Sequence, residues 1–86
     1  INDLSGIANM EGALGTCYDI EGDMKQALYY FNKSLETAEL SENKESIAKA
    51  LLDIATIQKD YREFDKALEN GLKAIEICQM IEKYKN

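Results

Sequence analysis

The sequence predicts an all-α fold of two stacked antiparallel helix hairpins, an α-solenoid arrangement. A shift of 40 residues lays Ala27 on Ala67 and Leu28 on Leu68, so the chain repeats internally. Proline is absent and the connections are short and polar, which makes each helix fold back on the one before it. The central stretch has the spacing of a helix that buries one face, with apolar residues at Met24, Ala27, Leu28, Phe31, Leu35 and Ala38. A helix pair recurring at such a period is typical of a stacked solenoid.

The first hairpin is expected to contain helices over about 4–20 and 24–40. Asn2 or Asp3 can act as the N-cap of the first helix. Gly22-Asp23 suits the turn, because glycine accepts the left-handed end of one helix and aspartate caps the next. Each glycine inside a helix costs up to about 1 kcal/mol, so close packing is the expected reason for three of them. These glycines are Gly6, Gly12 and Gly15.

The second hairpin repeats the first with a less regular turn. The polar group 41–43 provides a short connection or a cap, and a third helix is expected over about 44–59. In the turn 60–63, Arg62 occupies the place of Gly22. We therefore expect Arg62 to hold a backbone angle that glycine accepts more readily. A fourth helix follows from about position 64.

We interpret residues 1–86 as one small domain with repeats over about 4–43 and 44–83. The chain opens in mid-pattern at Ile1, which indicates a segment of a longer protein. Eighty-six residues bury only a thin core, so support from neighbouring structure is expected.

The composition argues against several partners. A net charge of -6 repels a phosphate backbone, so nucleic-acid binding is not expected. No long apolar run or signal-peptide pattern is present, so no membrane association is expected. Cys17 and Cys78 lack metal-ligand spacing and are interpreted as small buried residues. Unpaired thiols favour a cytoplasmic location.

No arrangement of residues predicts catalysis, a metal or a cofactor. The glycines near Leu14-Gly15-Thr16 lack the lysine of a phosphate loop. Acidic clusters near 19–23 and 60–65 lack the ligand alternation of a calcium loop and are interpreted as caps and solvated faces. Histidine is absent, and neither cysteine has a plausible base beside it. We predict that the segment is not an enzyme and binds no cofactor.

The repeat resembles the tetratricopeptide repeat family. Leu14-Gly15-x2-Tyr18 matches the motif of that family's first helix, and Ala27 with Phe31 matches the second. Small residues at Gly15 and Ala27 allow the two helices to approach closely. The second copy departs further, with Gln58 and Gly71 in the places of Tyr18 and Phe31 and the period 40 rather than the usual 34. Glu11 and Leu51 occupy the family's tryptophan position, and Glu39 and Gln79 its proline position.

The resemblance implies that the first helix of each hairpin lines a concave partner-binding groove. The implied groove residues are Asn9, Gly12, Thr16, Asp19, Ile20, Lys49, Leu52, Thr56, Lys59 and Asp60. Gly12 and Thr16 stand where relatives carry part of a clamp for chaperone-tail carboxylates, so such tails are disfavoured. The mixture of charges favours a mixed or mildly polar peptide. Of the tyrosines, only Tyr29 is a good surface candidate.

The resemblance predicts a protein-protein or peptide-binding module of a larger bacterial signalling or regulatory protein. Two alternatives stay open. The segment is a regulatory input of a multidomain enzyme, such as a nucleotide cyclase or histidine kinase, or it is a structural self-association module.

The fourth helix carries more apolar residues than one face can bury. We expect Leu68, Leu72 and Ile75 to reach the third helix. We expect a self-association edge at Ile77, Met80 and Ile81, through which the chain forms a homo-oligomer.

Overall fold

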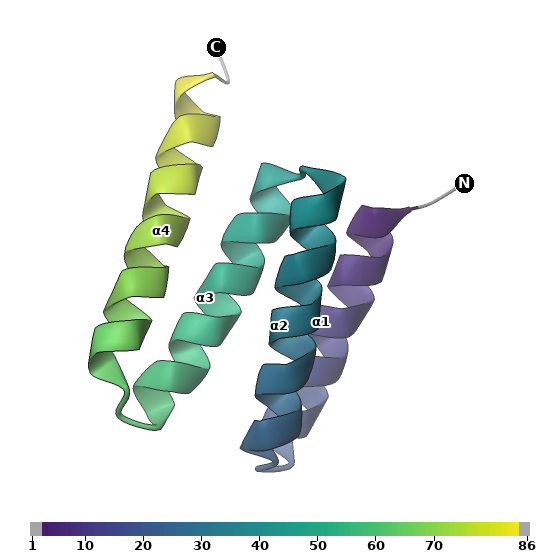
Figure 1. Cartoon of the computed structure of the whole chain (residues 1–86), viewed down its shortest axis with the longest axis vertical. Coiled ribbons are helices and arrows are strands. Elements are labelled where there is room, and N and C mark those ends of the chain that lie inside the picture. The colour runs from purple at the N-terminus through teal and green to yellow at the C-terminus, as the bar shows by residue number, and fades with distance from the viewer. Residues whose placement is uncertain (1–2, 85–86) are drawn as a thin grey trace.

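The computed structural model describes residues 3–84, which form two antiparallel helix hairpins (Figure 1). The helices are α1 (Leu4–Ile20), α2 (Met24–Ser41), α3 (Lys44–Asp60) and α4 (Phe64–Lys83). The all-α prediction is confirmed, and the predicted helix bounds agree to within one residue where both ends were given. The longer period therefore lengthens the helices and leaves the connections short.

The hairpins stack in chain order. α3 contacts its partner α4 on one side and α2 on the other, with a smaller contact to α1. The α1/α2 hairpin lies at one end of the stack and α4 at the other, as the colour sequence in Figure 1 shows. Within residues 3–84, α4 contacts no helix other than α3. One side of the α3/α4 hairpin is thus left uncovered.

Side-chain caps start three of the helices. Asp3, Asp23 and Asn43 each accept a hydrogen bond from the backbone N–H three residues later, at 2.9, 3.2 and 3.1 Å. These bonds satisfy donors that have no partner inside the helix. Glu63, before α4, makes no such bond.

The two hairpin turns have the same backbone design. Gly22 has φ +84° and Arg62 has φ +66°, so both occupy the left-handed region. In each turn the following residue donates back to the carbonyl five positions earlier: Asp23 to Tyr18 at 2.9 Å, and Glu63 to Gln58 at 2.8 Å. This is the Schellman pattern of helix ends. Arg62 therefore holds the kind of backbone angle that the sequence predicted for it, one that glycine accepts more readily.

The core lies where α1, α2 and α3 meet. Its buried cluster contains Ala27, Phe31, Ile54 and Ile57. The half-buried side chains packed against this cluster are Tyr18, Met24, Leu28 and Leu35. The apolar face of α3 therefore covers one side of the α1/α2 hairpin.

The expected orientation of α4 is wrong. Ala67 and Ala74 are the buried residues of α4, because small side chains allow its close approach to α3. Leu68, Leu72 and Ile75 are consequently turned outward and exposed. Ile77 and Ile81 are only partly exposed, since they lie on the same side of the helix as the two alanines.

Candidate binding surface

The predicted groove residues come from α1 and α3, the first helix of each hairpin. Nine of the ten are exposed, and Gly12 is buried. A Cβ built on Gly12 would lie 3.5 Å from Ser34 Oγ of α2, and 3.7 Å and 3.9 Å from Lys49 Nζ and Asp53 Oδ2 of α3. Gly12 therefore marks a place where α2 and α3 both pack on α1, not an open part of a groove.

A polar hollow of about 350 Å³ lies between the N-terminal ends of α1 and α3. Asn9 and Lys49 are the predicted residues that line it. Ser5, Asn43, Glu45 and Ser46 complete its lining. Lys49 forms an exposed ion pair with Asp53 at 3.2 Å, so its charge is partly neutralised at this end.

A second hollow is an apolar groove of about 490 Å³ between α3 and α4, which we call the α3/α4 groove. Three predicted residues, Leu52, Thr56 and Lys59, line its α3 side. The rest of its lining is Ala55, Phe64, Ala67, Leu68, Gly71, Leu72 and Ile75. Phe64 and Leu68 are 60% and 63% exposed. This apolar groove thus combines the predicted α3 face with the unpredicted outer face of α4.

The α4 side of this groove was missed, although the internal repeat carried the signal. Residues 40 positions before Phe64, Leu68 and Ile75 are the half-buried Met24, Leu28 and Leu35, which pack beneath α3. Among residues 3–84 no helix follows α4 in the stack, so the residues of the second repeat lack the cover that α3 gives to the first.

Thr16, Asp19, Ile20 and Asp60 line neither of these two hollows. Thr16 and Thr56 donate their hydroxyls to the carbonyls of Gly12 and Leu52, at 3.1 and 2.9 Å, so both hydroxyl protons are engaged within their own helix. Asp19, Ile20 and Asp60 are exposed at the C-terminal ends of α1 and α3.

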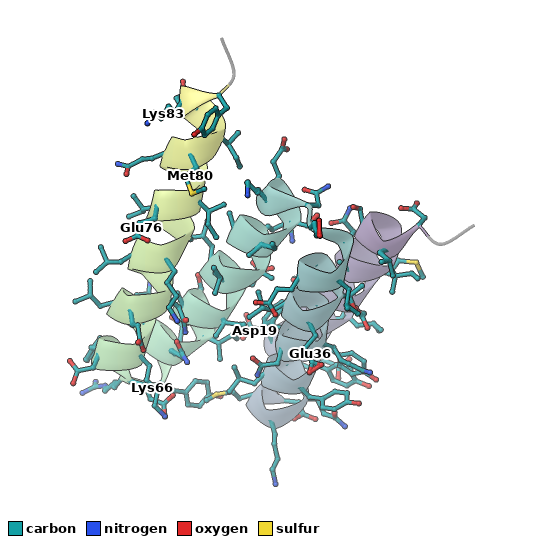
Figure 2. All side chains as sticks on the ribbon, turned by 45° about the horizontal axis from the view of Figure 1, so that its top comes forward. Asp19, Glu36, Lys66, Glu76, Met80 and Lys83 are labelled. Carbon is teal, nitrogen blue, oxygen red and sulfur yellow. The ribbon has the colours of Figure 1, made fainter. Side chains whose placement is uncertain are left out.

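The predicted edge residues Ile77, Met80 and Ile81 do not form one exposed patch. Met80 is exposed as expected, in a shallow hollow with Glu76, Gln79 and Lys83. Figure 2 shows Glu76, Met80 and Lys83 following one another along α4, toward the end away from Lys66. Charged neighbours flank Met80, so this side of α4 is less apolar than the α3/α4 groove.

Both cysteines were expected to be buried, and this is wrong. Cys17 and Cys78 are exposed and unpaired. They lie on α1 and α4, the first and last helices of the part of the chain that the structure describes.

The described residues also bear on other kinds of site. Among residues 3–84, no group of three or more acidic, cysteine or histidine side chains is placed to hold a metal ion. Within the same range, no helix is long and apolar enough to cross a membrane.

A family model described as tetratricopeptide repeat matches residues 6–80. The chain belongs to the tetratricopeptide repeat family. No curated protein and no solved structure matches it significantly. Tetratricopeptide repeats generally mediate protein-protein interaction and are typically not catalytic.

Proposed function

We propose that the domain is a protein-protein interaction module whose α3/α4 groove holds an amphipathic helix of its partner. The single observation that carries the proposal is the apolar lining of the groove by Phe64, Leu68, Leu72 and Ile75, all of them at least half exposed. Complete burial of such side chains contributes roughly 1.5 to 3 kcal/mol each. A contiguous set of them in a concave surface is typical of an interaction site.

The chain itself contains an example of the proposed ligand. α3 lies on the α1/α2 hairpin with Ile54 and Ile57 in the core cluster beside Ala27 and Phe31. The α3/α4 groove is the same surface moved along the chain by one repeat. An amphipathic helix with branched apolar residues at the spacing of Ile54 and Ile57 is therefore the segment whose shape fits it best.

Polar groups at the rim would orient that helix. Lys59 and Thr56 lie on the α3 side of the groove, and the polar hollow with Asn9 and Lys49 lies farther along the same helix face. Rim charges of this kind affect register and association rate more than affinity. The partner segment is thus mainly apolar on one face and carries polar residues at its edges, rather than being polar throughout.

The wider context forms part of the proposal. The long-helix repeats favour a bacterial signalling or regulatory protein, with the module acting as a scaffold or as an input to an enzyme domain. A sensory or catalytic domain in the same polypeptide would support that context. A partner-binding role for the groove does not depend on it.

A peptide with the sequence of residues 43–61 tests the proposal directly, because it contains the α3 face. We expect fluorescence anisotropy to show saturable binding of the labelled peptide to the chain. Leu68→Glu should abolish the binding. Leu40→Glu is the matched control, since Leu40 is also exposed but lies on α2, outside the groove. Absence of binding, or equal binding by both variants, would contradict the proposal.

A further inference from the structure

The two ends of the stack carry complementary unpartnered faces. On α3, the residues Ala50, Ile54 and Ile57 are buried. The residues 40 positions earlier, on α1, are Met10, Leu14 and Cys17, and all three are exposed. We call these three residues the α1 face. Met10 alone is 70% exposed.

The opposite end shows the reverse relationship. Met24, Leu28 and Leu35 are half-buried under α3, whereas the corresponding Phe64, Leu68 and Ile75 are exposed in the α3/α4 groove. Among residues 3–84, the α4 end has a groove with no helix over it. The α1 end has an exposed helix face with no hairpin against it. A single 40-residue shift relates both free faces to the junction inside the chain.

From this relationship, and building on the proposed function of the groove, we propose that the helix held there is α1 of a second copy. The copies would stack head to tail. The α1 face of one chain would lie over the α3/α4 groove of the next, as α3 lies over the α1/α2 hairpin within one chain. The contact would join two different surfaces, so it would not close into a symmetric pair and would leave one free face at each end.

The α1 face and the α3/α4 groove each differ in sequence from the corresponding residues of the junction inside the chain, and the two sets of differences complement each other. Inside the chain, Gly12 lies beside Ser34 of α2 and beside the charged pair Lys49 and Asp53 of α3. In the proposed contact Leu52 stands in the place of Gly12, while Asn9 and Ala13 stand in the places of the charged pair. The receiving side thus gains an apolar side chain where the docking side loses both charges.

A second substitution on the receiving side has the same direction. Leu72 occupies the place of Asn32, an exposed polar residue of α2. A surface that faced only solvent would need neither Leu52 nor Leu72, because exposed apolar side chains add nothing to the stability of one chain. Both changes are accounted for when the groove is covered by an uncharged helix face.

Sedimentation of the intact 86-residue chain tests this assignment. The weight-average mass should rise with concentration from the 9.7 kDa of one chain and continue beyond that of a dimer. Leu68→Glu in the groove and Met10→Glu on the α1 face should each reduce the mass to that of a monomer. Leu40→Glu, which adds the same charge at an exposed leucine outside both faces, should leave the association unchanged.

An equimolar mixture of the two monomeric variants gives the decisive result. The Leu68→Glu chain keeps an intact α1 face, and the Met10→Glu chain keeps an intact groove. Their mixture should form a dimer that grows no further. A mixture that stays monomeric, or a Met10→Glu chain that still associates, would overturn the head-to-tail arrangement.

The same samples separate this inference from the proposed function. If the unmodified chain is monomeric at every concentration yet binds the 43–61 peptide, the second-copy assignment fails and the groove keeps its protein-binding role. If it is monomeric and does not bind the peptide, both fail. Circular dichroism checks that each variant is folded, and Phe64→Glu, at another exposed groove position, replaces Leu68→Glu if that variant is not.

Discussion

Phe31 lies directly against the backbone of Gly15, so a Cβ built on Gly15 would lie 2.6 Å from Phe31 Cδ1. The Phe31 ring is only 3% exposed and belongs to the core cluster, so it has little room to move. This contact explains why a residue with low helix propensity occupies the middle of α1.

Gly15→Ala is expected to destabilise the domain despite the better helix propensity of alanine. Propensity favours alanine by up to about 1 kcal/mol, whereas forcing a methyl group into a packed core costs about 1 to 3 kcal/mol. Gly71→Ala is the matched control, because within the described part of the chain nothing beyond its chain neighbours and the nearby backbone of its own helix lies within 4 Å of its built Cβ. Urea unfolding should show a loss of stability for the first variant and a gain of up to about 1 kcal/mol for the second. A gain for both would contradict the packing role of Gly15.

Asn43 joins the two hairpins as well as capping α3. Its side-chain oxygen accepts from Ser46 N at 3.1 Å, and its Nδ2 donates to Ser5 Oγ at 3.0 Å. Asn43→Ala removes both bonds and should lower the free energy of unfolding by about 1 to 2 kcal/mol. Asn43→Asp keeps the cap and loses only the donor, so it should cost less. Equal losses for the two variants in thermal or urea unfolding would show that the cap on Ser46 adds nothing, and an Asn43→Asp variant as stable as the original chain would show that the bond to Ser5 adds nothing.

Arg62 holds φ +66° in a turn whose counterpart has Gly22. The left-handed region costs a non-glycine residue roughly 1 to 2 kcal/mol, partly offset by the greater freedom that glycine has in the unfolded chain. Arg62→Gly should therefore stabilise the domain by about 0.5 to 1 kcal/mol. Arg62→Ala serves as the control, because it removes the same side chain without relieving the backbone. A stabilisation by alanine equal to that by glycine would locate the effect in the side chain.

Glu11 carries an unsatisfied polar atom. Its Oε1 is buried and has no hydrogen-bond partner among residues 3–84. The second repeat has Leu51 at this position, and Leu51 is buried. Burial of an unpaired polar group costs about 1 to 3 kcal/mol, so Glu11→Leu should raise the free energy of unfolding. Glu11→Gln is the comparison variant, and a greater gain from glutamine than from leucine would contradict the apolar character of the site.

Local chemistry made the helices and their ends predictable. The Asp3 and Asp23 caps, the Gly22 turn and the strained Arg62 each follow from residues adjacent in sequence, so the pattern alone indicated them. The close approach at Gly15 also followed from the repeat motif. These features depend on neighbours within one or two helical turns.

The residues that line the α3/α4 groove could not be predicted, because they depend on which side of α4 faces α3. The spacing of the large apolar residues of α4 did not determine that side. Ala67 and Ala74 allow the closest approach, so they face α3 and turn Leu68 and Leu72 outward. The exposure of Cys17 has a similar origin, because it depends on whether a helix lies beyond α1. The orientation of α4 and the exposure of Cys17 are both determined by how the helices stack, which the pattern of a single helix does not show.

The claim that the α3/α4 groove binds an amphipathic helix is tested most directly by NMR of the ¹⁵N-labelled Met10→Glu chain, whose groove is intact. On addition of the unlabelled 43–61 peptide, we predict amide shift changes concentrated at Leu52, Leu68, Leu72 and Ile75. Changes confined to α1 and α2, or no changes at saturating peptide, would contradict the account.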